Sequence, residues 1–407
     1  MIEAAFFVYA HVLLKRRKQA ALLASRDHQL LTSSRANAVM TRVLATTPSA
    51  AAFFLQWVHD DETDKTTPPS RREVRELLAF LFFAAQHARD VRDASELDAL
   101  VDRYMAALPQ TSARRDEALP PRRLMKFYFE PDEPTAAHRP LAYWAVVDGL
   151  FQSVLVPARM ALHGFKVHRH GSFKYWIRPG ANAALKPIVF FHGLGVGLLP
   201  YLGFFTAMEA RFPERTFVYA EVGLISQRFD PDDLEPARFS ADVVAAMQSH
   251  GHAAINLVGH SYGTFIAAWV LRHAPVGFVA SACLVDPATL LLHHTDVMYN
   301  LLYKKRNSSS LERVLDYVMR GDGFFYIHLR HSFTWHQNLI FLDEISVPLR
   351  VVLSDADQVI PVKQIQAYAK SASQPVTVLK NTDHGGFSID GAHTAWLVDE
   401  LTGLVVD

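Results

Sequence analysis

One short stretch limits the fold of this chain more than any other. Residues 255–258 are apolar except for Asn256 and rich in branched side chains. Gly259-His260-Ser261-Tyr262-Gly263 follows, and residues 265–271 are again apolar. The first run is typical of a buried strand and the last of a helix, so the Gly-x-Ser-x-Gly motif occupies a sharp turn between them. Glycines two positions before and after the serine let strand and helix approach closely. The Ser261 hydroxyl then stands at a helix N-terminus, where N–H groups favour a developing negative charge.

Strand and helix patterns alternate through the second half of the chain. A hairpin-like pair of segments, 165–170 and 172–177, flanks Gly171, and a helix is expected at about 239–249. Buried strands are expected at 187–191, 216–222, 278–285, 349–353 and 376–379, in addition to the strand before Ser261. Such alternation indicates crossover units on a mostly parallel sheet, which is the α/β class. Residues 288–345 interrupt the pattern and are rich in aromatic side chains.

The first third of the chain shows helical patterns instead. Apolar segments at 51–58 and 77–85 are separated by charged and proline-containing stretches. We expect an N-terminal helical extension over residues 1–135 and an α/β domain over residues 136–407. No catalytic motif stands out in the extension, and the sequence does not give its role.

Two apolar segments raise the question of membrane contact. Residues 2–14 are apolar apart from Glu3 and His11 and are followed by four basic residues, but a span needs about 20 residues. This segment is expected either to pack on the protein as an amphipathic helix or to lie peripherally in a membrane interface. Residues 141–158 approach membrane length, yet Asp148 near their centre favours a buried or interfacial helix over a span. No cleavable signal is evident, so the expected location is intracellular, with membrane association left open.

Charge and side-chain chemistry argue against several classes of partner. The chain has 41 Lys and Arg against 41 Asp and Glu, so no net field recruits nucleic acid, and no nucleic-acid partner is expected. The single cysteine, Cys283, excludes an intramolecular disulfide, and its apolar surroundings indicate a buried strand residue. Histidines gather within 288–345 without the spacing of a metal motif, so neither a metal nor another cofactor is expected. They are His293, His294, His328, His331 and His336.

From about residue 160 to its C-terminus the chain resembles the α/β-hydrolase superfamily, in its serine esterase and lipase branch. The stretch around Ser261 matches the nucleophile elbow of that family, and His192-Gly193-Leu194-Gly195 matches its oxyanion loop. The segments after two late strands, 354–361 and 381–387, match its acid and base turns. The resemblance implies the α/β-hydrolase fold, with residues 288–345 as a helical lid over the site.

The resemblance also implies a catalytic triad in the order Ser, Asp, His. Ser261 is the expected nucleophile, His384 the base and Asp357 the acid that orients the base. The family's pattern puts the acid four residues before a proline, and Asp357 stands four residues before Pro361. Asp355 and Asp286 remain competing candidates for the acid.

The expected oxyanion hole consists of the backbone N–H groups of Leu194 and Tyr262. The predicted activity is hydrolysis of a carboxylic ester or thioester of an apolar, lipid-like small molecule through an acyl-serine intermediate. Aromatic and aliphatic side chains of the expected lid favour an apolar substrate. Two alternatives stay open, an acyltransferase that uses the same triad and a binding protein that keeps the fold without catalysis. The sequence does not give the oligomeric state.

Overall fold

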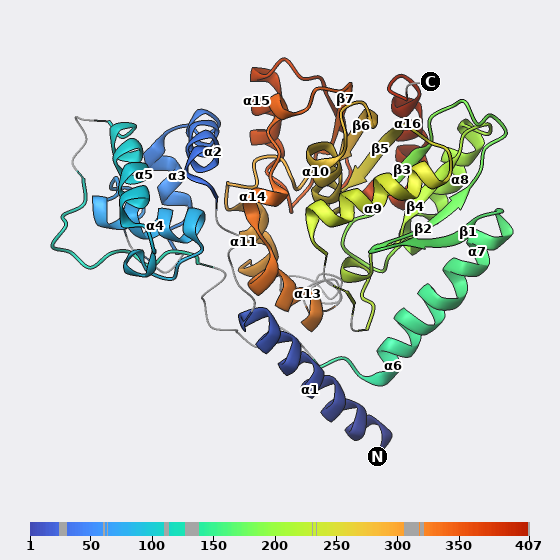
Figure 1. The fold of residues 1–407 in the computed structure, drawn as a ribbon, viewed down its shortest axis with the longest axis horizontal. Coiled ribbons are helices and arrows are strands. Elements are labelled where there is room, and N and C mark those ends of the chain that lie inside the picture. Colours follow the sequence, from blue (N-terminus) through green and yellow to red (C-terminus); the bar gives the residue numbers. More distant parts are fainter. Residues whose placement is uncertain are drawn as a thin grey trace.

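In the computed structural model of the chain, an eight-stranded sheet forms the centre of the larger part of the molecule (Figure 1). The structure describes residues 1–23, 31–59, 62, 64–109, 114–126, 138–229, 231–232, 234–304, 317 and 321–405. The strands are β1 (Lys166–His170), β2 (Phe173–Arg178), β3 (Ile188–Phe191), β4 (Phe217–Ala220), β5 (Ile255–His260), β6 (Val279–Val285), β7 (Leu349–Ser354) and β8 (Val376–Leu379). Their spatial order is β1-β2-β4-β3-β5-β6-β7-β8.

This strand order is that of the α/β-hydrolase fold, and the fold predicted from the sequence is confirmed. Strand β2 is antiparallel to both β1 and β4, whereas all the other neighbouring pairs are parallel. The helix expected at 239–249 begins earlier, at Pro236. It does so because the Glu235 carboxylate accepts hydrogen bonds from the N–H groups of Ala237 and Arg238 in the first turn.

Helices cover both faces of the sheet. Successive strand residues point to opposite faces, so Val189 and Phe191 of β3 pack in one layer and Ile188 and Phe190 in the other. The first layer contains α9 (Pro236–Ser249), α10 (Gly263–His273) and α15 (Val362–Ser371), and the second contains α8 (Leu202–Arg211) and α16 (Gly391–Thr402). Cys283 is fully buried in the second layer, where burial raises the pKa of its thiol to about 12. The thiol is therefore inert at neutral pH.

A group of helices from the N-terminal third lies beside the sheet domain (Figure 1). It contains α2 (Ser33–Ala45), α3 (Ala50–Gln56), α4 (Arg71–Phe83), η2 (Ala88–Asp90) and α5 (Ala94–Ala106). A capping box starts α4, because Ser70 and Glu73 each accept a hydrogen bond from the other's backbone N–H. The helical character predicted for this region is confirmed. The boundary predicted at residue 135 falls within 127–137, outside the described residues.

Short helices of the 288–345 insertion lie between this group and the sheet. They are α11 (Asp296–Leu302), α13 (Gly323–Ile327), η6 (His328–Ser332), α14 (Trp335–Asn338) and η7 (Leu342–Glu344), and residues 305–316 and 318–320 lie outside the described part. The N-terminal helices pack directly on the insertion. The Trp335 indole N–H donates to Leu81 O at 2.8 Å, and Thr46 Oγ1 lies 2.9 Å from His293 Nε2. One apolar core thus runs from α4 through the insertion to the sheet.

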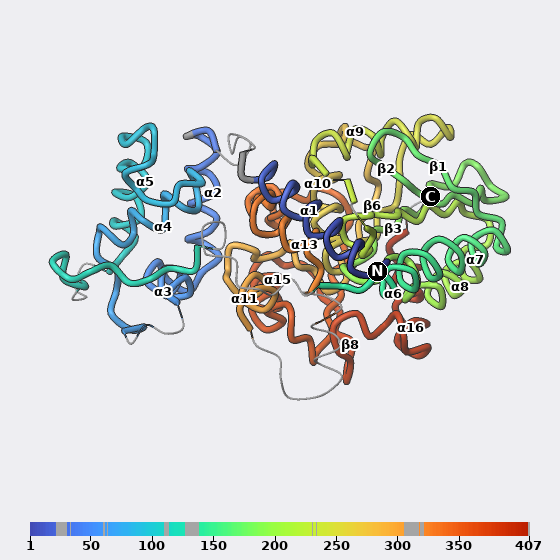
Figure 2. Tube along the Cα trace, turned by 90° about the horizontal axis from the view of Figure 1, so that it is seen from below, coloured from blue at the N-terminus to red at the C-terminus, as the bar shows by residue number. Residues whose placement is uncertain are grey.

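Two further helices run along one side of the molecule (Figure 2). One is α1 (Ile2–Leu23); the other, continuous over Leu141–Leu162, joins α6 (Leu141–Trp144), the π-helix η3 (Ala145–Leu155) and α7 (Val156–Leu162). They meet near their N-termini, where the Glu3 carboxylate accepts the Leu141 N–H at 3.0 Å. By length and composition, Leu141–Leu162 is the one straight helix in the described residues that could cross a membrane. The helices Ser34–Ala45 and Ala50–Gln56, bent by 98°, would count only as one broken span.

Candidate active site

The expected turn around Ser261 is present between β5 and α10. Ser261 has a backbone φ of +51°, a left-handed conformation that a non-glycine residue adopts only when its surroundings impose it. Its N–H donates to Val285 O at 2.9 Å, which ties the turn to β6. A side chain at Gly263 has no room, because a Cβ there would lie 2.2 Å from Phe191 O. Close approach of α10 to β3 therefore depends on this glycine.

The structure brings the three predicted triad side chains into one hydrogen-bonded chain. His384 follows β8, and its Nε2 lies 2.7 Å from Ser261 Oγ. Its Nδ1 lies 2.5 Å from Asp357 Oδ2. An imidazole that donates its Nδ1–H to a carboxylate presents the Nε2 lone pair to the serine hydroxyl. The arrangement can therefore accept the proton of the Ser261 hydroxyl as its oxygen attacks an electrophile.

Backbone donors fix Asp357 in the orientation that this contact requires. Its Oδ1 accepts the N–H groups of Val359 at 2.7 Å and Ile360 at 3.1 Å, and its side chain is fully buried. The competing Asp355 faces elsewhere, since its carboxylate accepts the Thr382 N–H at 3.4 Å. Of the two carboxylates in this turn, Asp357 is the one in contact with His384.

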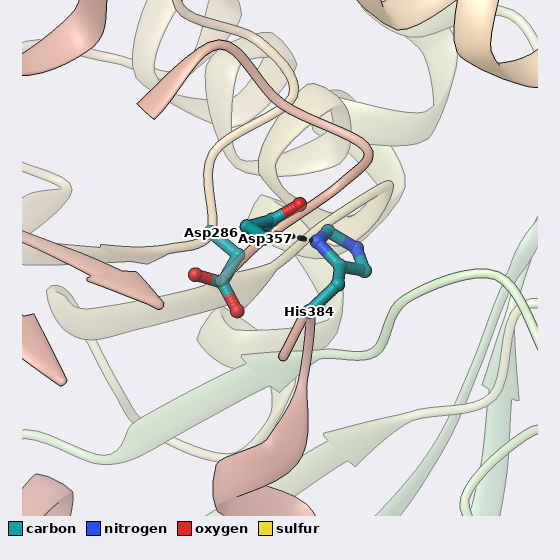
Figure 3. Close-up of side chains that lie close together, drawn as sticks. All are labelled: Asp286, Asp357 and His384. Carbon is teal, nitrogen blue, oxygen red and sulfur yellow. Dashed lines mark hydrogen bonds and ion pairs between the residues drawn. The ribbon is translucent and has the colours of Figure 1, made fainter. Parts of the chain in front are cut away.

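Asp286, the third candidate acid, lies beside the imidazole without a hydrogen bond to it (Figure 3). It follows β6 with a φ of +44° and is fully buried. Its carboxylate accepts Ser354 N–H at 2.7 Å, Ser354 O–H at 2.9 Å and Gly385 N–H at 2.9 Å. Burial acts to raise the pKa of Asp286, but the imidazoles of His260 and His384 and the Gly385 N–H hold it below its ordinary value. Asp286 is thus an ionised anchor for the backbone next to His384.

The three side chains in Figure 3 also offer the atoms of a metal site, because one ligand atom from each of Asp286, Asp357 and His384 lies within 4.8 Å of the others. Their existing contacts do not fit a cation. Both oxygens of Asp286 already accept N–H or O–H donors, and His384 Nδ1 faces Asp357. The arrangement suits transfer of a proton better than coordination of a metal.

The predicted oxyanion loop lies against the Ser261 turn. A Cβ at Gly193 would be 3.0 Å from Ser261 Cβ, so loop and turn are in contact. Gly193 N–H donates to the Tyr201 hydroxyl at 3.0 Å, and Gly195 N–H donates to Ile225 O at 3.0 Å. These two bonds fix the backbone on both sides of Leu194. The second expected donor, Tyr262 N–H, stands at the start of α10.

A buried polar chain connects the oxyanion loop to the loop of the base. The Tyr201 hydroxyl accepts the Gly193 N–H and lies 2.7 Å from His260 Nδ1. His260 Nε2 in turn lies 3.8 Å from Asp286 Oδ2, and Asp286 holds Gly385. Burial lowers the pKa of His260, so its imidazole is neutral at pH 7. The motif position of His260 suggests that its imidazole fixes a turn through hydrogen bonds, but the sequence carries no signal for Tyr201, which stands in an apolar stretch typical of a packed core.

The insertion covers the residues that follow the nucleophile. Tyr262 O–H lies 3.0 Å from His328 Nε2, and its ring packs edge-on against Phe325 with 5.8 Å between centroids. One turn later, Phe265 packs on Phe333 at 5.5 Å. These insertion side chains are buried, so the part of the insertion that packs on Tyr262 and Phe265 is largely apolar.

Comparisons with known proteins return similarity in solved structures alone. No protein-family model and no curated protein sequence matches the chain. One similar structure is a membrane phospholipase A described as a bacterial virulence factor, with 19% sequence identity over 64% of this chain and 93% of that chain and a TM-score of 0.46. Another is naproxen esterase from Bacillus subtilis, with 14% identity over 63% of this chain and 98% of that chain and a TM-score of 0.43. A third is a 2-hydroxy-6-oxo-6-phenylhexa-2,4-dienoate hydrolase from Rhodococcus sp. strain RHA1, with 11% identity over 59% of this chain and 98% of that chain and a TM-score of 0.43. More than a third of this chain lies outside each alignment.

Proposed function

We propose that this protein is a serine hydrolase that cleaves a carboxylic ester or thioester of an apolar, lipid-like small molecule. The observation that carries the proposal is the unbroken hydrogen-bonded chain from Ser261 Oγ through His384 to Asp357. A serine hydroxyl is a weak nucleophile at neutral pH, and this chain supplies the base and the carboxylate that it needs.

The reaction follows from these contacts in two halves. Ser261 Oγ attacks the carbonyl carbon while His384 Nε2 takes its proton, and the N–H groups of Leu194 and Tyr262 stabilise the tetrahedral oxyanion. The intermediate expels the alcohol or thiol, which receives the proton from His384, and an acyl-Ser261 ester remains. His384 then deprotonates a water, which attacks the acyl carbon, and returns that proton to Ser261 Oγ as the acyl–serine bond breaks and the acid is released. The Asp357 carboxylate stabilises the imidazolium in both halves.

The apolar substrate class rests on the side chains around the turn. Phe325 and Phe333 of the insertion pack over Tyr262 and Phe265, which lie one and four residues after the nucleophile. A cover of this composition favours an acyl chain over a polar group. We propose residues 288–345 as a lid on the same grounds.

The proposal is tested by hydrolysis of p-nitrophenyl esters of increasing acyl length. Ser261→Ala should lower kcat at least about a thousandfold, because the nucleophile is lost while the fold is kept. Ser371→Ala, which removes an exposed hydroxyl at the end of α15, is the matched control and should match wild type. A fluorophosphonate probe should phosphonylate Ser261 of wild type with loss of fluoride, and so add the mass of the phosphonyl group to its peptide.

Undiminished activity in Ser261→Ala would contradict the proposed nucleophile. Equal activity at every acyl length would contradict the apolar substrate class. A folded wild type that the probe labels but that releases product only when an alcohol acceptor is added would identify an acyltransferase, and one that is neither labelled nor active would identify a binding protein.

A further inference from the structure

Most of the exposed large apolar side chains of the molecule lie on two helices. Of the sixteen such residues in the described part of the chain, twelve belong to α1 with Met1 or to the helix Leu141–Leu162. They are Met1, Ile2, Phe7, Val8, Tyr9 and Val12, and Leu141, Val146, Leu150, Val154, Leu155 and Leu162. We call these twelve residues the two-helix face. Apolar exposure concentrated in this way marks a site of interaction.

The helix Leu141–Leu162 is held to the protein along one side. Val147 and Gln152 are buried, and Asp148 points inward to Arg228, with 2.5 Å between carboxylate and guanidinium. Because the charged residue and the buried positions share one side, the opposite side is the apolar one. Leu150 and Val154 lie there. The helix is therefore built to lie along a surface.

Helix α1 is attached in the same manner. Its Phe6 ring packs 5.6 Å from Phe229, its Ala10 is buried, and Arg17 donates to Pro231 O at 3.0 Å. These positions recur at helical spacing, whereas Val8 and Val12 are exposed. Figure 2 shows both helices on one side of the molecule, close together where the Glu3 carboxylate contacts the Leu141 N–H. Their exposed apolar sides thus contribute to one surface.

The charges of these helices indicate what this surface contacts. The two helices contain two acidic residues, and both are paired, Glu3 with His138 at 3.1 Å and Asp148 with Arg228. Their cations are Lys15, Arg16, Arg17, Lys18 and Arg159. Lys15 and Arg16 are exposed beyond the apolar part of α1. An apolar face bordered by cations matches the interface of a membrane that contains anionic lipid.

We propose that the two-helix face docks on the surface of an anionic phospholipid bilayer, with both helices lying in the interface. Docking of this kind buries the twelve apolar residues among acyl chains and brings the basic end of α1 to the headgroups. It requires no change in the fold, because the inward sides of both helices keep their present contacts.

The docked helices contact the elements that surround Ser261. A Cβ at Gly197, in the oxyanion loop, would lie 2.7 Å from Gln152 Oε1 of the long helix. On the other side, a Cβ at Gly323 of α13 would lie 3.0 Å from a methyl group of Leu14 in α1. Docking would therefore place the elements that hold the oxyanion loop and α13 at the membrane that contains an apolar substrate. This consequence rests on the proposed hydrolase function, whereas the docking itself does not.

The test is co-sedimentation of the full chain with vesicles of phosphatidylcholine containing about 30% phosphatidylserine, with pure phosphatidylcholine vesicles for comparison. Ser261→Ala is the background, so that hydrolysis cannot alter the vesicles. The double variant Val8→Glu, Leu150→Glu should lower the partition coefficient at least about tenfold, since it places two carboxylates in the interface. Val276→Glu is the matched control, because Val276 is a fully exposed apolar residue in the loop before β6, and it should bind like the background.

A second pair of changes tests the charge contribution. Lys15→Glu with Arg16→Glu should weaken binding to the anionic vesicles more than binding to phosphatidylcholine. All variants should keep the circular dichroism spectrum of the parent and, with Ser261 restored, the hydrolysis of a short soluble ester. If neither wild type nor any variant hydrolysed the ester, this result would contradict the proposed hydrolase function but not the docking proposal.

Three results would overturn the docking proposal. The first is a parent protein that stays in solution with both kinds of vesicle. The second is a Val8→Glu, Leu150→Glu variant that binds as tightly as the Val276→Glu control. The third is a parent that elutes as a dimer without lipid while the double variant elutes as a monomer, because a second copy of the chain would then cover the face.

Discussion

Two buried carboxylates stand next to one imidazole, and their hydrogen bonds assign them different tasks. Asp357 contacts His384 Nδ1, whereas Asp286 holds the backbone of Gly385 and of Ser354. We expect Asp357→Asn to lower kcat about 10⁴-fold on a short soluble ester, because the amide favours the wrong imidazole tautomer. Asp286→Asn should lower kcat only about ten- to a hundredfold and also lower Tm, since it weakens an anchor of the loop.

The two variants separate the roles when kcat and Tm are measured together. An Asp286→Asn protein that loses as much kcat as Asp357→Asn at an unchanged Tm would show that Asp286 is the acid. Asp355→Asn is the matched control for the same turn, since its carboxylate faces Thr382, and it should retain activity close to wild type.

Gly263 gives a second prediction at the scale of one residue, for the stability of the protein. Gly263→Ala places a Cβ 2.2 Å from Phe191 O, and rigid backbone cannot move away cheaply, so we expect a loss of about 3 kcal/mol in the free energy of unfolding. Gly203→Ala in α8 is the matched control, because no atom lies within 4 Å of its Cβ, and alanine should be neutral or stabilising there. Urea denaturation measures both. Equal free energies of unfolding for the two variants would contradict the close packing of α10 on β3.

Among the elements, the strands were the part most open to sequence reasoning. Six of the predicted strands are short, mainly apolar runs bounded by turn residues, and the other two are the hairpin-like pair around Gly171; all eight exist, from β1 to β8. The acid and base turns could be located because they follow β7 and β8 directly. Contacts between distant segments could not be located in this way. The bond from Trp335 to Leu81 joins residues 254 apart, and neither residue carries a local signal for the other.

This contact gives a prediction for the elements that it joins. Trp335→Ala should lower the free energy of unfolding by about 3–5 kcal/mol and speed amide exchange in α4, because the indole both fills the space next to Phe82 and donates to Leu81 O. Trp335→Phe keeps a ring against Phe82 and should cost less. Hydrogen exchange across 77–83 is the measurement. Exchange in α4 that is equal in Trp335→Ala and wild type would show that the insertion does not support the N-terminal helices.

For the whole molecule, buried histidines couple stability to pH. Burial lowers the pKa of His192 to about 4 and that of His293 well below its ordinary value of 6.5. Their unfolded forms bind protons first as pH falls, so stability is complete above about pH 6.5 and is lost between that value and the folded pKa. For His192 alone the loss from pH 7 to pH 4 is about 3 kcal/mol.

Denaturation in urea at pH 7 and pH 4.5 measures this dependence. His293→Gln should reduce the difference between the two pH values, because the group that must be protonated is gone. His170→Gln, on the exposed strand β1, is the control and should leave the difference unchanged. A wild type that is equally stable at both pH values would mean that these imidazoles are charged in the folded protein.

The burial of Cys283 has a practical consequence for all of these experiments. The chain contains one cysteine. Its thiol is buried between the sheet and the layer that contains α8 and α16, and burial raises its pKa to about 12. A new cysteine on the surface therefore becomes the single site that reacts with a maleimide at neutral pH, without prior engineering of a cysteine-free chain. Spin labels at positions 8, 150 and 276 would report accessibility to oxygen and to a water-soluble paramagnet, and so measure the depth of each position relative to lipid phosphates.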